Sequence, residues 1–573
     1  MLYPIQNIEQ ALDQLPKQVP NASPSERRSW ANKRDWLIKL SNLPLLKHAM
    51  IQLERILPGS NKQRTDILIW LKFQRQFVCI IIEDKQWQLK HMHYDPMIQA
   101  YRSKRDRKWR IHPAQQVYSY QKHWEFSELN EYFPVTYIPL MHLINVTNES
   151  ELKQFQSHHE RSSDVHWSRK HTLLEKIQDL ISPYGTSLRI YPHEQHRIVQ
   201  PHHRSHKPIP VPNMKDYLLP DQAILCAQIE AEILKRKKIK KAYVPILMRR
   251  SWGGGKSFMA VHLYNQLKNH FVSKLISGSD TYVKHLQQTH LAGIYDTLHH
   301  LEQAVEQCEL IILDDAVRIM TDDAQKYRLL LNLFLRKGGI LILFGDPDQT
   351  NRPINPKWEK ELFSNVYFIK KMKNLTPTRN TIQQFRTSLD WNAILSKIWG
   401  ESETLSAYDQ KSIFLTNNFR TAWQMYQSHR SGSQDAVIQA PYAYPWNSRT
   451  NPQESDIVID AYEFQWASSQ DSVLHPDQHV AHAHRVTGLS FDHGLYIWKW
   501  LIVRNGVWQI NSTDPCYHKQ FQCNQSQQLD PNLTQLIVAH VEYMLTKIVK
   551  TCVIYVEDTE TLEYLMQKMY WNE

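Results

Sequence analysis

Short apolar runs alternate with helical patterns through the carboxy-terminal part of the chain. From about residue 216 these runs read VPILM, LIIL and ILILF, and later HGLYIW and TCVIYV. Buried strands separated by helices are typical of parallel α/β sheets, and this stretch is long enough for two of them. The pattern therefore predicts two parallel α/β lobes, over residues 216–400 and 401–573.

The amino-terminal residues 1–150 mix helical and strand patterns and contain one clear hairpin. The segment RTDILIWLKFQRQFVCIIIEDKQW has two β-rich arms around a polar FQRQ turn. If the turn is symmetric, paired residues have numbers that sum to 149. Asp66 then lies opposite Glu83, and Lys85 lies on the same face two residues further on.

The three charged residues of this hairpin suggest a hydrolytic site. Asp66 and Glu83 can hold a hard divalent cation such as Mg²⁺ or Mn²⁺, and Lys85 can orient water and balance charge on a phosphate. An edge hairpin with a cross-strand charge pair would show the same residues. We favour the metal site, because the charges interrupt the apolar run VCIIIEDK, where burial without a function would be costly.

Residues 151–215 are expected to form a linker. Their second half, YPHEQHRIVQPHHRSHKPIPVPNM, is rich in His, Pro and Arg, and its prolines oppose a continuous helix. The histidines could bind a metal, but a solvated tether explains this composition more simply. The sequence thus predicts one domain over 1–150, then the linker over 151–215, then the two lobes.

The run VPILMRRSWGGGKSFMAVHLYNQL reads as a strand, a glycine-rich loop and a helix. Glycines let backbone amides turn toward a phosphate, a lysine adds charge at the terminal phosphates, and a serine at the helix start can ligate Mg²⁺. The alternative is a glycine-rich helix cap. The residues expected to bind nucleotide are Gly253, Gly254, Gly255, Lys256 and Ser257.

Two further apolar strands end in polar residues. CELIILDDAVRI ends in Asp314, expected to hold Mg²⁺, and Asp315, expected to polarise the attacking water. ILILFGDPDQT delivers Asp346 and Gln349. Because ligand sites of parallel sheets gather at the carboxyl ends of strands, these segments and the glycine-rich loop predict one nucleotide site.

Composition narrows the class of protein. Hydrophobic residues make up 42% of the 573 residues, enough for well-packed cores. The net charge of +11 favours a polyanionic partner, but charge alone does not separate this from a generally basic soluble protein. The start lacks a signal pattern, and no apolar run reaches the roughly 20 residues of a membrane span. Six scattered cysteines indicate reduced thiols in a cytoplasmic protein. Cys516, His518 and Cys523 lack a fourth metal ligand at a suitable spacing.

A basic segment, RSKRDRKWR, follows the hairpin. It is either an ordinary solvated loop or a loop that grips phosphates, and its position between two candidate site segments favours the second reading. Its basic residues are Arg102, Lys104, Arg105, Arg107, Lys108 and Arg110.

The amino-terminal half resembles the PD-(D/E)XK nuclease superfamily. Asp66 and the run EDKQW (83–87) match its carboxylate and lysine motif, especially as found in nuclease domains that precede Schlafen-type DNA/RNA helicase domains in bacterial proteins. HPAQQVYSY (112–120) is similar to the helix that follows in those domains. The resemblance implies a mixed α/β nuclease domain with Gln116 beside the metal site and Glu54, on a preceding helix, completing it.

The carboxy-terminal half resembles superfamily 1 helicases, and among them the Schlafen-type DNA/RNA helicase domain, which implies two RecA-like lobes. GGGKS and LIILDDA match the phosphate-loop and magnesium motifs, and LLPDQ implies that Gln222 reads adenine. GDPDQ contains Gln349, LTNNFRT implies that Arg420 reaches the γ-phosphate, and the closing segment from Tyr543 places Lys547 at the position of a catalytic arginine. The segment TGLSFDHGLYIWKW also has a counterpart in the family.

Several positions depart from the family pattern. Arg250 stands where the phosphate loop normally has glycine, and Ser490 replaces a glutamate. Asp315 replaces a glutamate, so the side chain expected to act as the catalytic base is shorter. Lys547 replaces the arginine, and an ammonium cannot make the bidentate contact with a phosphate that a guanidinium makes. The sequence therefore predicts ATP binding but puts vigorous hydrolysis in doubt.

These features together predict a nuclease–helicase that cuts single- or double-stranded DNA with a divalent metal and binds ATP. The resemblance implies bacterial antiviral defence. Two alternatives stay open: a nucleotide-gated nucleic-acid-binding protein with a degenerate motor, and an RNA-directed nuclease. No membrane association is expected, and a protein partner or an oligomer is compatible with the sequence.

Overall fold

The computed structural model divides the chain into two compact units, Met1–Lys235 and Arg236–Glu573, and each is described by itself. The residues that the structure describes are 2–19, 22, 24–57, 64–74, 76–125, 127, 129–199, 218, 220–235, 242–247, 255–278, 283, 295–316, 319, 324–345, 389–400, 405, 407–430, 435–468, 473, 476–483, 485–486, 489–511 and 531–570.

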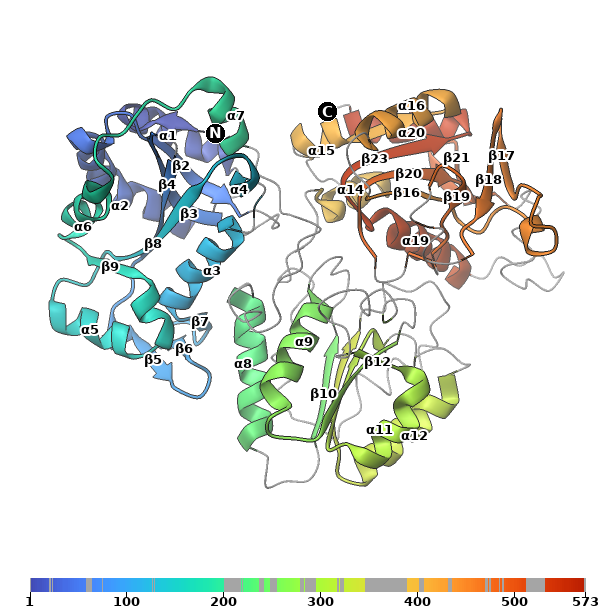
Figure 1. Ribbon diagram of the computed structural model, residues 1–573, viewed down its shortest axis with the longest axis horizontal. Coiled ribbons are helices and arrows are strands. Elements are labelled where there is room, and N and C mark those ends of the chain that lie inside the picture. The colour runs from blue at the N-terminus through green and yellow to red at the C-terminus, as the bar shows by residue number, and fades with distance from the viewer. Residues whose placement is uncertain are drawn as a thin grey trace. The chain divides into compact units, whose positions relative to one another are not determined.

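A six-stranded mixed sheet forms the centre of the first unit (Figure 1). Its strands in spatial order are β1 (Tyr3–Pro4), β2 (Met50–Ile56), β3 (Arg64–Phe73), β4 (Gln76–Lys85), β8 (Val135–Leu143) and β9 (His166–Arg169). The pairs from β1 to β4 are antiparallel, whereas β8 is parallel to both β4 and β9. The fold is therefore mixed α/β, as the sequence predicts.

Helices cover both faces of this sheet. The strand residues alternate in burial direction, so that Ile67 and Ile80 pack on one face and Leu68 and Ile81 pack on the other. The first face is covered by α1 (Ile8–Gln18), α2 (Pro24–Ser41) and α6 (Leu173–Ile181). The second is covered by α3 (Pro113–Glu125), α5 (Glu149–Ser157) and α7 (Pro192–Val199). A short helix, α4 (Leu129–Tyr132), follows α3.

The structure corrects the predicted linker. Residues 151–199 contain most of α5, and also β9, α6 and α7, and β9 extends the central sheet. Proline does not prevent α7, because Pro192 is its first residue, where the missing amide has no helical partner. The first unit also includes α8 (Pro220–Lys235), so its boundary lies near residue 235 rather than 150.

A small three-stranded antiparallel sheet is inserted between β4 and α3. It consists of β5 (Met92–Asp95), β6 (Ala100–Ser103) and β7 (Trp109–Ile111). Tyr101 of β6 is fully buried, and its ring lies 5.7 Å from that of Trp87, just after β4. This contact joins the small sheet to the end of the central hairpin.

The second unit begins with a five-stranded parallel sheet. Its order is β10 (Ala242–Leu247), β14 (Ile340–Gly345), β13 (Leu310–Asp314), β11 (Ser273–Ser277) and β12 (Tyr295–Thr297). Helices α11 (Leu301–Gln307) and α12 (Gln325–Arg336) pack on one face. Helix α9 (Lys256–Leu267) contacts β11, β13 and β14.

A second parallel sheet follows, with the order β15 (Ile413–Thr416), β23 (Ile548–Val556), β20 (Phe491–Trp498) and β16 (Ala436–Gln439). One face packs against α14 (Trp391–Ile398), α19 (Pro531–Leu545) and α20 (Thr559–Tyr570). The other packs against α16 (Phe419–Arg430) and a small sheet of β17 (Ile457–Ile459), β18 (Tyr462–Trp466) and β19 (His479–Val480). Helix α15 (Ala407–Ser412) precedes β15, and β21 (Leu501–Arg504) and β22 (Val507–Ile510) form a hairpin.

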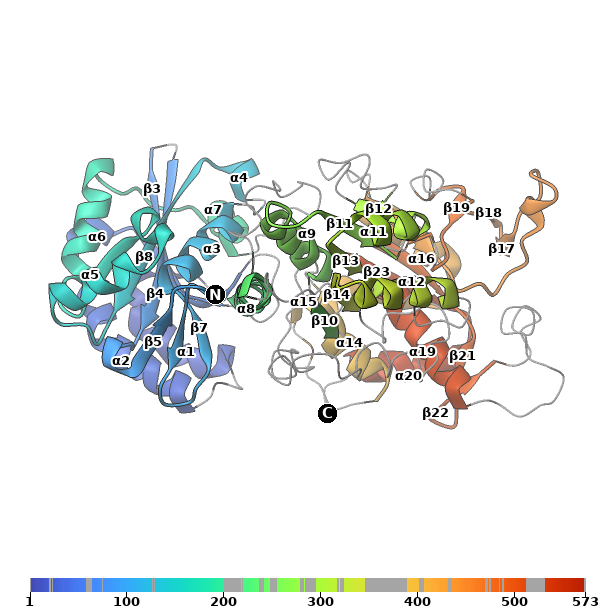
Figure 2. The ribbon, with the colours of Figure 1, turned by 90° about the horizontal axis from the view of Figure 1, so that it is seen from below.

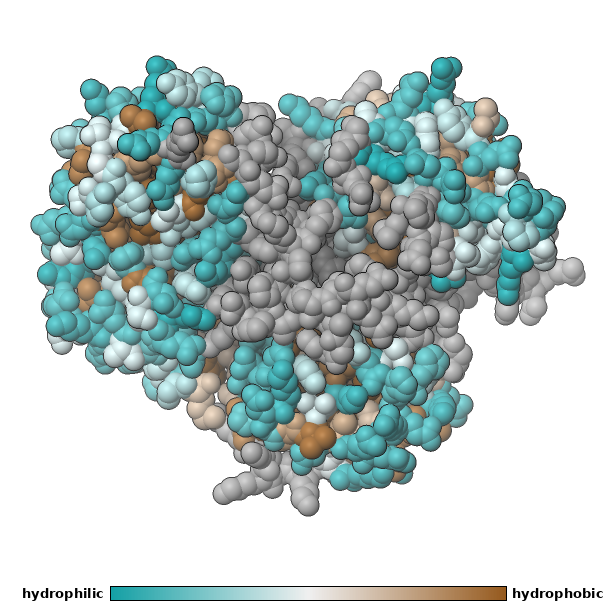
Figure 3. All heavy atoms as spheres, viewed as in Figure 1, coloured by the Kyte–Doolittle hydropathy of each residue, from teal (hydrophilic) through white to brown (hydrophobic). Residues whose placement is uncertain are grey.

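The apolar runs of the carboxy-terminal half are thus confirmed as parallel strands in two sheets. The second sheet's core begins at Leu389, earlier than the predicted residue 401. Figures 1 and 2 show helices on both sides of each sheet. The described surface in Figure 3 is mostly hydrophilic, with small apolar groups. Among the described residues, no helix is long and apolar enough to cross a membrane.

Close packing of β20 on β23 gives a test of this second sheet. A Cβ atom built on Gly494 would overlap the side chain of Ile548, which is fully buried. We expect Gly494→Ala to lower the free energy of unfolding by about 1–3 kcal/mol through overpacking. The same substitution should cost less in an Ile548→Ala background, and urea unfolding of the four proteins in this double-mutant cycle measures the coupling. Equal costs in both backgrounds would contradict the packing.

Candidate active site

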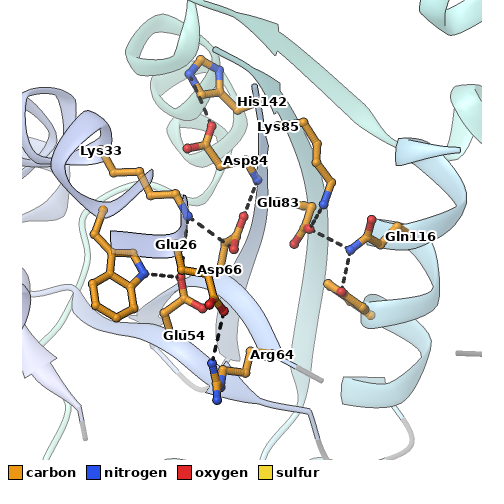
Figure 4. A network of polar contacts seen from close by, with 12 residues as sticks. Glu26, Lys33, Glu54, Arg64, Asp66, Glu83, Asp84, Lys85, Gln116 and His142 are labelled. Atoms are coloured by element: carbon orange, nitrogen blue, oxygen red, sulfur yellow. Dashed lines mark hydrogen bonds and ion pairs between the residues drawn. The ribbon is translucent and has the colours of Figure 1, made fainter. Parts of the chain in front are cut away.

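The pairing of β3 with β4 follows the predicted register. The pairs run from Ile67 with Ile82 to the turn, and the residue numbers of each pair sum to 149. Extended by one position beyond Ile67 and Ile82, this register sets Asp66 opposite Glu83, and the backbone N–H of Asp84 donates to Asp66 Oδ2 at 2.8 Å. In Figure 4 both side chains lie at this end of the hairpin, between α2 on one side and α3 on the other.

Glu83 lies at the centre of a hydrogen-bonded group. Its side chain is 3% exposed, and its Oε1 accepts hydrogen bonds from Lys85 Nζ at 2.6 Å and from Gln116 Nε2 at 2.8 Å. Gln116 also donates to the Tyr120 hydroxyl at 2.7 Å. The structure therefore brings together Glu83, Lys85 and Gln116, and it adds Tyr120, one turn along α3. Tyr120 ends the HPAQQVYSY motif, but the sequence assigned it no role.

Asp66 is held from two directions. Its Oδ2 accepts the backbone N–H of Asp84 at 2.8 Å, and its Oδ1 lies 3.3 Å from Lys33 Nζ. Lys33 is on α2, is only 4% exposed, and also lies 3.8 Å from Glu54 Oε1. Trp30 Nε1 donates to the same Glu54 oxygen at 2.9 Å. Lys33 (Figure 4) and Trp30 are thus additional members of the cluster.

Glu54 lies beside the site, but not on a helix as the resemblance implies. It is a residue of β2. Its backbone has φ of 48°, in the left-handed region that L side chains rarely adopt. Leu53 and Arg55 pair with Ile67 and Thr65 of β3 on either side of it. Strained backbone of this kind is typical of functional sites, where surrounding contacts compensate its cost.

Asp84 adds a fourth carboxylate. Its side chain is 1% exposed, and the nearest cationic candidate, His142 Nε2, lies 4.0 Å from Oδ1. Burial lowers the pKa of His142 to about 4, so this imidazole is neutral near pH 7. Neither carboxylate oxygen of Asp84, nor Oε2 of Glu83, has a hydrogen-bond partner. Buried oxygens without partners are costly and indicate a site that can accept a ligand.

The electrostatics of the cluster follow from crowding negative charge in a buried place. Burial raises the pKa of Glu83 to about 8, and the charge of Asp66 adds to this shift while Lys85 opposes it. Burial likewise raises the pKa of Asp84 to about 7 and the pKa of Glu54 above its ordinary value. Burial alone would lower the pKa of Lys33, but the surrounding carboxylates, Asp66 foremost, raise it overall. The ammonium therefore stays charged.

The donor types fit a hard divalent cation, since four carboxylates approach one end of the sheet and three of their oxygens lack partners. The spacing is wider than a metal requires. In the described part of the chain, no group of three or more His, Cys, Asp or Glu residues is close enough to hold a metal ion. Cys516, His518 and Cys523 lie outside the described residues.

The basic segment forms a β-hairpin rather than a simple loop. Its ends lie in β6 and β7, and the guanidinium of Arg102 lies 5.7 Å from the ring centre of Trp109. Arg110 pairs with Asp106 at 2.7 Å. Arg102 is exposed, and so are the four basic residues at the turn: Lys104, Arg105, Arg107 and Lys108. The hairpin therefore presents a compact group of positive charges to solvent.

The predicted nucleotide loop is described from Gly255 onward, and Gly253 and Gly254 lie outside the described residues. Gly255 precedes α9 with φ of 79°, a backbone that glycine adopts without strain. Lys256 is the first residue of α9. Ser257 follows it, and its side chain hydrogen-bonds to the carboxylate of Asp314.

Asp314 ends β13 and faces the start of α9. Its side chain accepts a hydrogen bond from the Tyr295 hydroxyl at 3.0 Å, a partner that the sequence did not indicate. Burial raises the pKa of Asp314, while the hydrogen bond from Ser257 acts in the opposite direction. Asp315 has φ of 57°, and aspartate is one of the few residues that adopt this backbone readily. The structure thus brings Ser257, Asp314 and Asp315 together.

The remaining predicted nucleotide residues are dispersed. Gln222 is buried on α8 in the first unit, and Gln349 lies outside the described residues. Arg420 is exposed at the start of α16, just after β15, whereas Lys547 directly precedes β23. Since β15 and β23 are parallel, Arg420 and Lys547 lie at opposite ends of this sheet and are not brought together. The ammonium of Lys547 lies 4.1 Å from the ring centre of Tyr543.

A family model described as the DNA/RNA helicase domain of Schlafen group 3 matches residues 251–558, more than half of the chain. The chain belongs to this family. The match covers the glycine-rich loop, Asp314 at the end of β13, Asp315 directly after it, and the second parallel sheet. No curated protein matches the chain in sequence.

Similar solved structures are distant. DnaA from Aquifex aeolicus bound to AMPPCP is 18% identical, with a TM-score of 0.20 over 27% of this chain and 48% of that one. Mss116p bound to single-stranded RNA and AMP-PNP is 10% identical, with a TM-score of 0.23 over 60% of this chain and 65% of that one. The chain spans about half the length of the replication initiation factors that it matches. Scores this low establish no shared architecture.

The basic hairpin makes a measurable prediction about nucleic-acid binding. Replacing Lys104, Arg105, Arg107 and Lys108 with glutamine should weaken binding to all sequences alike. It should also reduce the slope of log affinity against log salt by up to about 3–4, because each phosphate contact to duplex DNA contributes about 0.9. Fluorescence anisotropy at several salt concentrations measures both effects.

The matched control replaces four other exposed lysines of the first unit, Lys39, Lys47, Lys153 and Lys170. This variant has the same change in net charge. A loss of slope that is equal in the two variants would assign the effect to overall charge, and the hairpin would then be an ordinary solvated surface.

Proposed function

We propose that the first unit cleaves phosphodiester bonds in DNA with the help of a divalent metal, and that the second unit is an ATP-binding helicase-like motor. The observation that carries the nuclease proposal is the group of polar side chains where β3 begins and β4 ends. There Asp66, Glu83 and Lys85 occur with Gln116, and Glu83 keeps one buried oxygen without a partner. Membership of the Schlafen group 3 helicase family supports the motor.

In this proposal Asp66 and Glu83 hold Mg²⁺ or Mn²⁺. When bound, such an ion lowers the pKa of a water molecule and neutralises charge on the phosphate. Gln116 fixes the orientation of Glu83 through Oε1, which leaves Oε2 directed elsewhere. Lys85 is within hydrogen-bond distance of Glu83 and can orient the attacking water or bind a phosphate oxygen.

The substrate is a polyanion, and the basic hairpin of the same unit supplies charge to bind it. The ammonium of Lys85 lies 5.9 Å from the ring centre of Trp87, and Trp87 contacts Tyr101 of the small sheet that carries the hairpin. This chain of contacts supports a common path for the nucleic acid. We propose DNA as the substrate, with RNA as the alternative. A cytoplasmic role in bacterial antiviral defence is what the resemblance implies.

For the motor, we propose that Lys256 and the glycine-rich loop bind the phosphates of ATP, with Mg²⁺ on Ser257 and Asp314. Asp315 would polarise the attacking water. The hydrogen bond between Ser257 and Asp314 supports this assignment, because both side chains already converge where the ion would bind. The roles of Gln222, Gln349 and Arg420 rest on the resemblance.

A second function is favoured by the position of Lys547. Its ammonium lies over Tyr543 and at the opposite end of the sheet from Arg420. A motor without a catalytic cation at the γ-phosphate would bind ATP and change conformation without rapid hydrolysis. The protein would then be a nucleotide-gated nucleic-acid-binding protein. Steady-state ATP turnover with and without single-stranded DNA separates the two functions.

The nuclease proposal is tested by removing the Lys85 ammonium. We expect Lys85→Ala to abolish metal-dependent cleavage of labelled DNA, because water activation and charge balance are lost. Binding to the same DNA should stay near normal. The control is Lys90→Ala, which removes an exposed lysine five residues away. If cleavage and binding fell together, Lys85 would be only a phosphate contact and the hydrolytic role would be wrong.

The motor proposal is tested by nucleotide binding and turnover. ATP at a hundred times its dissociation constant should stabilise the protein by about 2.7 kcal/mol, and Lys256→Ala should remove this effect. We expect slow turnover, and we expect Asp315→Glu with Lys547→Arg to increase it. Glutamate on the left-handed backbone of residue 315 should itself cost about 1 kcal/mol of stability. Turnover of tens per second in the unaltered protein would contradict the inferred defect.

A further inference from the structure

Lys33 is a buried cation among the carboxylates of the candidate nuclease site. Only 4% of it is exposed, and its Nζ lies 3.3 Å from Asp66 and 3.8 Å from Glu54. It comes from α2, on the opposite side of the site from α3, which provides Gln116 (Figure 4). A buried ammonium is costly unless it is paired, and here the pairing partners include a candidate metal ligand.

The position of this ammonium explains the spacing of the carboxylates. Mg²⁺ holds its oxygen ligands at about 2.0–2.1 Å, so the oxygens around it are crowded together. An ammonium holds them further away, as the 3.3 Å separation from Asp66 shows. The described carboxylates are too far apart to enclose an ion. Glu83 Oε2 and both oxygens of Asp84 are nevertheless buried without hydrogen-bond partners, as expected of atoms that can coordinate a ligand.

We propose that Lys33 is an internal counter-cation that holds Asp66 and Glu54 in the metal-free protein, and that a divalent ion binds there by displacing it. This inference rests on the proposed nuclease function and deepens it. Lys33 acts on the reaction through Asp66 and is therefore a positioning residue. Its long aliphatic stem lets the ammonium withdraw once the ion neutralises the carboxylates.

Two opposite effects follow when Lys33 becomes an uncharged residue of similar length. The metal-free protein loses the cation that offsets the crowded carboxylates, so it becomes less stable. The divalent ion no longer competes with an ammonium, so it binds more tightly. A residue that only fills space would change stability without improving metal binding. The two effects together therefore distinguish a counter-cation from a packing residue.

The experiment compares full-length wild-type protein, Lys33→Met and Asp66→Asn without nucleotide. Mn²⁺ binding is measured by titration calorimetry, and the site in question is the one that Asp66→Asn removes. We expect Lys33→Met to lower the melting temperature in EDTA by several degrees and to tighten Mn²⁺ binding at least tenfold. The control is Lys39→Met on the same helix, where the lysine is exposed; it should change neither quantity.

The outcomes separate the two levels of the proposal. Mn²⁺ affinity that is the same in Lys33→Met and wild type overturns the counter-cation role and leaves the nuclease proposal standing. If neither wild type nor Lys33→Met binds Mn²⁺ at a site that Asp66→Asn removes, both the counter-cation role and the metal-dependent nuclease function are wrong. Should Lys33→Met not fold, Lys33→Arg takes its place. Arginine can grip Asp66 and Glu54 with its fork, so weaker Mn²⁺ binding than in wild type supports the proposal, and unchanged binding overturns it.

Discussion

The first unit depends on compensating negative charge that is buried at one end of a sheet. Four carboxylates converge where β2 and β4 end and β3 begins, in a place where uncompensated ions would be very costly. Lys33 and Lys85 offset part of this charge, from α2 and from β4 itself. The three-layer fold makes this possible, because helices packed on opposite faces can both reach the end of the strand. Burial and the remaining negative charge raise the pKa of Glu83, Asp84 and Glu54.

The sequence predicted the strand register on which this candidate site is built. The register of the hairpin followed from a symmetric turn, and alternation along the strands then assigned Glu83 and Lys85 to one face. Lys33 was missed, although its position carried a signal. Trp30, Lys33, Leu37 and Leu40 follow helical spacing, and all four are buried, so Lys33 interrupts the apolar face of α2. A charge at such a position is a sequence mark of a buried ion pair.

Other errors have a common origin in contacts between distant parts of the chain. The strand β9 is only four residues long and has the sequence HWSR, so no local pattern identifies it, and only pairing with β8 makes it a strand. Glu54 lies in MIQLERI, which is compatible with either a helix or a strand until β3 pairs with it. In the second unit β10, β13, β14, β20 and β23 were predictable because each contains an apolar run, as buried parallel strands require. Short strands such as β11 (SKLIS) and β12 (YDT) carry no such signal. Arg420 and Lys547 are separated because Arg420 follows β15, whereas Lys547 precedes β23, and the two strands are parallel.

The pairing of β3 with β4 also restricts how this segment can vary in length. A single residue inserted within either strand shifts the ladder by one position and turns every side chain beyond it to the other face. Asp66 and Glu83 lie at the end furthest from the turn, so any such insertion between them and the turn separates them. Deletions have the same effect unless they occur in both strands at matching positions. Chains that keep this chemistry are therefore expected to differ in length outside the two strands. Such differences would lie before Arg64, in the turn between Phe73 and Gln76, or beyond Lys85.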